Sequence, residues 1–213
     1  MRIANILRKV LRRLVPNNSV EKALGVDICE SGVMQNAIEL WHNMYKNEPP
    51  WRGGKDNVIP LNLPSAISEE FARLILTEFS MEVTGSPMAA FINEQLKDQL
   101  TDLNKFVEMY CEGGAIAVKP FVTNIDENGR PTAIELDFVK AVDFFPCAFN
   151  NKGEITAAVF VEGKKIGDYL YTRLEYHELT GMTYTIINKA FKSEEIYQYN
   201  DDGTYAVRDR FRK

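Results

Sequence analysis

The sequence has little of the side-chain chemistry on which most enzymes and metalloproteins depend. Its 213 residues include only two histidines, His42 and His177, and neither has a metal ligand at a characteristic spacing. The three cysteines, Cys29, Cys111 and Cys147, lie far apart and form no Cys-x-x-Cys pair. A disulfide framework or a zinc knuckle is therefore not expected, and a reducing compartment fits best.

Long apolar runs and ligand-binding motifs are also missing. No stretch approaches the roughly 18 apolar residues of a membrane span, and arginines interrupt the N-terminus, which argues against a secretory signal. There is no nucleophile elbow, phosphate loop or dinucleotide fingerprint. Asp201-Asp202-Gly203 lacks the spaced ligands of a calcium loop. The pairs Glu69-Glu70 and Glu194-Glu195 are expected on solvated faces. We predict no catalytic, cofactor-binding or metal-binding residues, no small-molecule substrate, and hence no enzyme.

Charge is unevenly distributed along the chain, which has a net charge of −5. Residues 1–20 contain no acid and five bases, namely Arg2, Arg8, Lys9, Arg12 and Arg13. The remaining 193 residues hold 20 bases against 30 acids. A body this acidic is not expected to bind DNA tightly, because phosphate neutralisation needs a basic surface.

Residues 1–16 are predicted to form a short basic helix with one apolar face. The apolar residues recur at three- and four-residue spacing, namely Ile3, Ile6, Leu7, Val10, Leu11 and Leu14. The five bases fall on the other faces and are the candidate partner-contact residues. Two interpretations stay open: an anchor for a membrane surface or a partner's groove, or an ordinary helix packed on its own domain or a sister subunit.

Three further helices are predicted in the first half of the chain. The first spans about 31–47, with Asp27 and Glu30 as a possible capping pair, and a proline-rich connection follows over 49–64. The next begins at a Ser65 cap. Its buried stripe is predicted to consist of Ile67, Phe71, Leu74, Ile75 and Phe79. The last begins at Ser86-Pro87 and runs unbroken to Glu112, and Gly113 or Gly114 takes the left-handed position at its end.

The second half shows the alternation of β-strands, as in Ile134, Leu136 and Phe138 and again over 155–161. Residues 127–130 contain Asn-Gly, which favours a tight hairpin turn with positive φ angles. Thr180-Gly181 and 201–203 are also predicted turns. Phe144-Phe145 could stack nucleic-acid bases, but the surrounding acids favour a core or interface role.

These patterns predict an α+β fold in which long amphipathic helices precede a mostly antiparallel sheet built from hairpins. We expect three parts: the basic helix at 1–16, a helical part over 17–114 and a β part over 115–213. The chain closes on a strand-like run ending in charge, so we expect either a fragment of a longer protein or a short form.

Four segments share the wording of a known protein family, namely Ser65–Gly85, Phe91–Pro120, Asp137–Pro146 and Gly153–Phe160, and Tyr171–His177 follows the same pattern. They resemble the N-terminal half of portal proteins of tailed phages, the head–tail connector subunits of siphophages and of prophages of Gram-positive hosts. The similarity covers about residues 20–200. The matching part corresponds to the outer α+β wing, with the stem, clip, channel loop and crown expected later in such a protein.

The resemblance implies a structural role without enzymatic activity. Portal subunits form rings, usually of twelve copies, at one capsid vertex of the virion, and double-stranded DNA passes through the ring during packaging and ejection. The implied partners are further copies of the chain, the terminase large subunit, capsid and scaffold proteins and head–tail adaptors. Assembly would take place in the cytoplasm of the bacterial host. The family's motifs assign no functional residue here.

Two other classes of function stay open. One is a peripheral module that docks on an anionic membrane or a partner through the basic N-terminal helix. The other is a hydrolase or nuclease that uses scattered acids with a metal ion.

Overall fold

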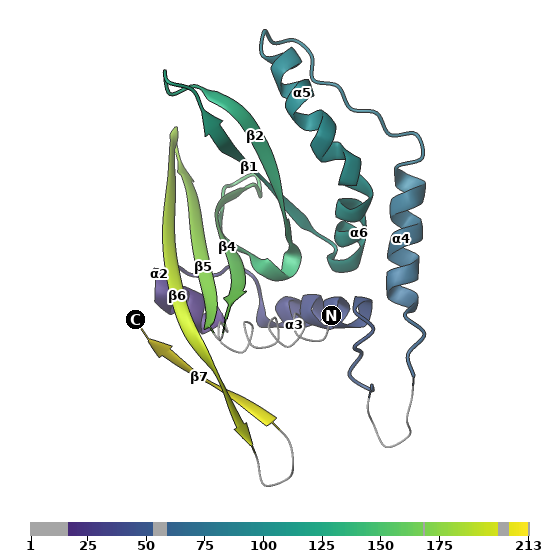
Figure 1. Cartoon of the computed structure of the whole chain (residues 1–213), viewed down its shortest axis with the longest axis vertical. Coiled ribbons are helices and arrows are strands. Elements are labelled where there is room, and N and C mark those ends of the chain that lie inside the picture. The colour runs from purple at the N-terminus through teal and green to yellow at the C-terminus, as the bar shows by residue number, and fades with distance from the viewer. Residues whose placement is uncertain (1–16, 53–58, 168, 200–204, 213) are drawn as a thin grey trace. The chain divides into compact units, whose positions relative to one another are not determined.

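The structure is a computed structural model that describes residues 17–52, 59–167, 169–199 and 205–212. Its contacts divide the chain into two units (Figure 1). The helical unit comprises Ser31–Val142. Among the described residues, the sheet unit combines 17–30 with those from Asp143 onward. This division differs from the expected boundary at residue 114, because the first hairpin belongs with the helices.

The helical unit begins with α3 (Gly32–Tyr45), α4 (Leu63–Ile75) and α5 (Ala89–Gln99). A 3₁₀ turn, η1 (Leu100–Asp102), separates α5 from α6 (Leu103–Gly113). The prediction of one unbroken helix to Glu112 is therefore wrong. The apolar periodicity continues through the turn, so the sequence pattern does not show the tighter winding. The hydrophobic cluster of this unit contains Ile38, Ala141 and Val142.

The ends of three helices differ in how closely they agree with the sequence prediction. Ser31 caps α3 by accepting a hydrogen bond from the Met34 N–H at 3.2 Å, so the predicted Asp27–Glu30 pair is wrong. Helix α4 starts at Leu63, two residues before the predicted Ser65 cap, with a proline in its first turn. Gly114 ends α6 with φ at 73°, which confirms the predicted left-handed glycine.

An antiparallel hairpin of β1 (Ile116–Ile125) and β2 (Pro131–Lys140) completes the helical unit. Between the strands only Gly129 has positive φ, at 77°. The connection is thus a longer loop, closed by the Asp126 carboxylate, and the predicted tight Asn-Gly turn is wrong in type but right in place.

Helix α5 covers the outer edge of β2 with two glutamine side chains. Gln95 accepts a hydrogen bond from the Ile134 N–H at 3.1 Å, and Gln99 donates to the Ile134 carbonyl at 2.7 Å. Gln99 also accepts from the Leu136 N–H at 2.5 Å. These bonds satisfy backbone groups that an uncovered edge strand would leave open to another chain.

The sheet unit is a five-stranded antiparallel sheet in the order β3-β4-β5-β6-β7. Its strands are β3 (Phe144–Phe149), β4 (Ile155–Ile166), β5 (Tyr169–Thr180), β6 (Thr183–Tyr199) and β7 (Tyr205–Arg212), and a short 3₁₀ turn, η2 (Ala141–Asp143), precedes them. Successive hairpins join the strands, and Gly181, with φ at 63°, lies in the turn predicted at Thr180-Gly181. The predicted turn at 201–203 lies outside the described residues. The predicted α+β class is confirmed.

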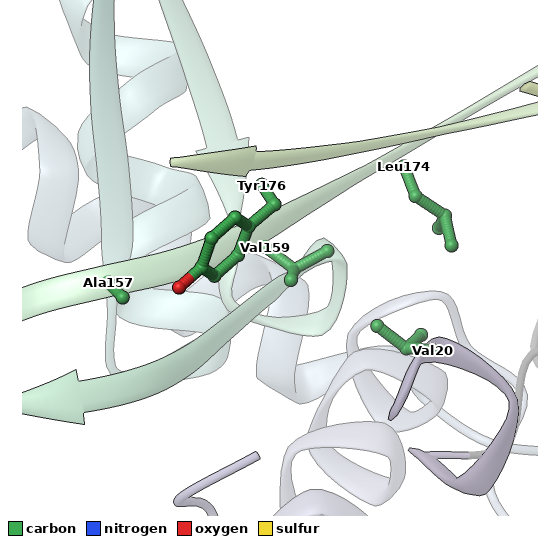
Figure 2. Close-up of a cluster of buried hydrophobic side chains, with 5 residues drawn as sticks. All are labelled: Val20, Ala157, Val159, Leu174 and Tyr176. Atoms are coloured by element: carbon green, nitrogen blue, oxygen red, sulfur yellow. The ribbon is translucent and has the colours of Figure 1, made fainter. Parts of the chain in front are cut away.

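Helix α2 (Asn17–Leu24) supplies one wall of the core of the sheet unit. Figure 2 shows Val20 with Val159 and Leu174, which are at most 1% exposed, and with Ala157 and Tyr176. Phe145 packs against the same cluster, as the core interpretation of Phe144-Phe145 predicted. The extended residues after α2 continue along β3, where the Cys29 N–H donates to the Pro146 carbonyl at 2.9 Å.

Candidate functional site

The largest departure from the sequence prediction is the apolar face of α4. The side chains of Leu63, Ile67, Phe71, Leu74 and Ile75, which we call the α4 face, are each 53–58% exposed. Phe79, just beyond the helix, is 49% exposed. The predicted buried stripe of this helix therefore lies at the surface.

A different and narrower face of α4 makes its contacts within the helical unit. Ser68 and Ala72 are buried, at 6% and 2% exposure, and α4 runs alongside α6 (Figure 1). These small side chains, one turn apart, leave room for the two backbones to approach closely. The helix thus packs through its small residues and leaves its large apolar residues uncovered.

A pocket of about 470 Å³ adjoins the α4 face within the helical unit. Ile67 belongs both to the face and to the pocket lining. The lining residues are Trp41, Met44, Tyr45, Pro64, Ile67, Ser68, Cys111, Glu112 and Gly114. The walls are mainly apolar and aromatic, which suits a large apolar side chain better than a polar metabolite.

One of the residues that line the pocket, Glu112, belongs to a buried ionic cluster. Glu112, whose side chain is 2% exposed, accepts a hydrogen bond from His42 Nδ1 and a second from Lys140 Nζ, at 2.6 Å. Lys140 Nζ also lies 5.5 Å from the centroid of the Tyr45 ring. The Tyr45 hydroxyl donates to Glu108 at 2.5 Å. These bonds join α3, α6 and β2.

The protonation states follow from the surroundings of each group. Burial lowers the pKa of His42 below its usual 6.5, although the hydrogen bond to Glu112 acts in the opposite direction. Burial alone would raise the pKa of Glu112, but the hydrogen bonds from His42 and Lys140 and the Lys140 charge together hold it below 4.5. The cluster is therefore a neutral imidazole beside a Lys–Glu ion pair.

The cluster holds elements of the helical unit together. The Glu112 carboxylate is hydrogen-bonded by both His42 and Lys140. Burial, followed by the charge of Glu108, raises the pKa of the Cys111 thiol, so this pocket thiol is not activated as a nucleophile. Burial and the hydrogen bond to Glu108 also raise the pKa of Tyr45.

A second histidine network lies on the sheet unit. His177 is hydrogen-bonded to Glu175 at 2.7 Å through Nε2 and to the Tyr184 hydroxyl through Nδ1. Glu178 lies on the other side of the strand, because neighbouring strand residues face opposite sides. The same alternation brings together positions 175 and 177, and Tyr184 is the diagonal neighbour of His177 on the next strand.

The remaining candidate residues from the sequence are the five bases near the N-terminus and the two pairs of adjacent glutamates. The five candidate contact residues, Arg2, Arg8, Lys9, Arg12 and Arg13, lie outside the described residues. Glu70 forms an ion pair with Arg73 at 2.6 Å on the exposed side of α4, and the side chains of Glu194-Glu195 are outside the described part. Within the described ranges there is no group of three or more His, Cys, Asp and Glu residues that could hold a metal ion.

Comparisons with known proteins add no family to these observations. A scan against family models, a search of curated proteins and a search of solved structures return no match. Among the helices that the structure describes, none is long and apolar enough to cross a membrane.

Proposed function

We propose that this chain is a structural subunit of a tailed-phage portal, contributing the wing of a ring through which double-stranded DNA is packaged and ejected. One observation carries the proposal. The first segment that resembles portal proteins, Ser65–Gly85, contains most of α4, and this helix exposes a continuous apolar face. Exposed apolar faces of this kind mark surfaces that contact other proteins.

Further apolar surface supports a role in assembly. At the turn of the β5–β6 hairpin, Leu179, Met182 and Tyr184 are 48%, 102% and 59% exposed. On β1, Val118, Val122 and Ile125 are 48–65% exposed. A subunit that contacts several neighbours needs several such surfaces.

Charge is consistent with DNA passing through the assembly without being held. The helical unit contains 16 acidic and nine basic residues, a net charge of −7. Strong binding would require many phosphate contacts from lysine and arginine.

The partners in this proposal are other copies of the chain, capsid and scaffold proteins, the terminase large subunit and tail adaptors. In this proposal the protein is part of the virion.

Electron microscopy of the gene product that contains this chain tests the proposal. We expect rings with a central channel wide enough for duplex DNA. A polyclonal antibody against the gene product should label one vertex of DNA-free heads and fail to label intact capsid faces. A product that stays monomeric at its highest soluble concentration, with no label on heads, would contradict the proposal.

A further inference from the structure

We infer that the α4 face is the docking site for residues 1–16 of a second copy of the chain. The inference rests on the proposed function, since it names the contact between neighbouring subunits of the ring. It starts from the observation that five large apolar side chains of α4 are each more than half exposed beside an apolar pocket.

The apolar residues of the segment match the face in length. From Ile3 to Leu14 an α-helix would span about 17 Å, and the α4 face from Leu63 to Ile75 spans about 18 Å at 1.5 Å per residue. Both sets recur at three- and four-residue spacing, which is the pattern of two helices packed along a shared stripe. The pocket beside Ile67 offers room for one large side chain from the segment.

Charge favours the same pairing. The segment carries five bases and no acid. Residues 63–82, which contain α4 and the chain just beyond it, hold four acids and the single base Arg73. All four acids, Glu69, Glu70, Glu78 and Glu82, are exposed. Glu70, which is paired with Arg73, lies beside the face, and Glu78 and Glu82 follow the helix. A basic helix lying on the α4 face would therefore meet a surface of net negative charge.

Symmetry points to a second copy as the source of the segment. Two α4 faces packed on each other would form an isologous contact, which closes at a dimer. A ring needs a heterologous contact, in which two different surfaces of the same chain are complementary. The basic apolar segment and the acidic apolar α4 face are two such surfaces.

Photo-crosslinking in the full chain tests this contact. Phe71 is replaced by p-benzoylphenylalanine, the protein is irradiated, and the dimer and monomer bands are separated under denaturing conditions. Digestion after glutamate keeps the segment within a peptide that ends at Glu21, and mass spectrometry identifies the captured residues. The matched control places the same probe at Met182, which is fully exposed on the sheet unit.

We expect a crosslinked dimer in which position 71 is joined to the peptide 1–21, with no such capture from position 182. Arg12→Glu with Arg13→Glu should lower the dimer yield several-fold, while the circular dichroism spectrum stays unchanged. Vesicles of phosphatidylcholine with phosphatidylserine, added before irradiation, should leave the yield unaltered.

Each of the following results would overturn the inference. Capture of peptide 1–21 within the monomer band would place the segment on its own chain. A dimer joined from one α4 to the other would make the contact isologous. Loss of the crosslink, with binding of the chain to anionic vesicles through Arg12 and Arg13, would assign the segment to a membrane surface. Rings without the 71-to-segment crosslink would refute this contact and leave the proposed function standing, whereas absence of any assembly would refute the function itself.

Discussion

At the scale of single residues, the helical unit depends on a buried carboxylate that the sequence did not single out. Glu112 lies 70 positions after His42 and 28 before Lys140, and the fold brings all three together. In the sequence, His42 has no metal ligand at a characteristic spacing. In the structure it is buried, at 2% exposure, and no local pattern could reveal its partner on another helix.

Replacing Glu112 with glutamine should destabilise the chain by about 3 kcal/mol, because removing one member of a buried ion pair leaves the other charge uncompensated. Lys140 would then lose its 2.6 Å ion pair with the carboxylate. Urea unfolding followed by tryptophan fluorescence measures the change. Glu69→Gln, on the exposed side of α4, is the matched control and should shift the unfolding free energy by no more than about 0.5 kcal/mol. Equal stabilities of the two variants would argue against the ion pair.

The pH dependence of stability should reflect the same cluster. Because the folded-state pKa of His42 lies below the 6.5 expected for the unfolded chain, the unfolded state binds more protons as the pH falls below 6.5. Stability should therefore decrease with acidification from that point, and further below pH 4.5 as Glu112 also protonates. His42→Asn keeps a nitrogen donor for Glu112 but cannot titrate. Its melting temperature should change less between pH 7 and pH 5 than that of the unaltered chain, and an equally steep decrease would contradict the assignment.

At the scale of elements, the sequence predicted where helices and hairpins lie better than which way they face. Three amphipathic helical stretches in the described residues and the order of hairpins followed from periodicity and turn residues. Helix α2 was not predicted, and the predicted helix at 1–16 lies outside the described residues. The orientation of α4 did not. Its stripe of large apolar residues was assigned to the core, because burial of the larger apolar face is the usual outcome for a helix of a single domain. A helix whose apolar face meets another molecule has the same sequence pattern.

Close packing of α4 on α6 through small residues has a measurable consequence. Ala72 is 2% exposed, so Ala72→Leu would insert three carbon atoms into a filled contact and should destabilise the chain by about 2 kcal/mol. The same substitution at Ala66, which is exposed on the same helix, should change the free energy of unfolding by no more than about 0.5 kcal/mol. Thermal unfolding of both variants measures the difference. If Ala72→Leu leaves the stability unchanged, Ala72 does not lie in a close contact between α4 and α6.

At the scale of the whole molecule, the chain builds part of the sheet unit, then the entire helical unit, and then returns to the sheet unit at Asp143. Sequence patterns could not show this order, because α2 and β3 are more than a hundred residues apart. What joins them is packing: Val20 is fully buried among strand residues, and Cys29 pairs with Pro146 through the backbone. Composition changes at the helix-to-strand transition near residue 114, whereas the contacts change at Glu30 and Asp143.

Charged substitutions on the α4 face test whether this face is an assembly surface or a core surface. Phe71→Glu combined with Leu74→Glu should leave the unfolding free energy of the monomer within about 0.5 kcal/mol, because both side chains are already 55% exposed. On the proposed function, the same double variant should abolish ring formation, since two carboxylates would have to be desolvated in each contact.

Leu174→Ala, at a position 1% exposed in the sheet unit, is the contrasting control and should cost about 3 kcal/mol in stability. Analytical ultracentrifugation and urea unfolding on the three proteins measure both quantities. If the double variant unfolds as easily as Leu174→Ala, the α4 face is a core surface; if it assembles normally, the contact between subunits lies elsewhere.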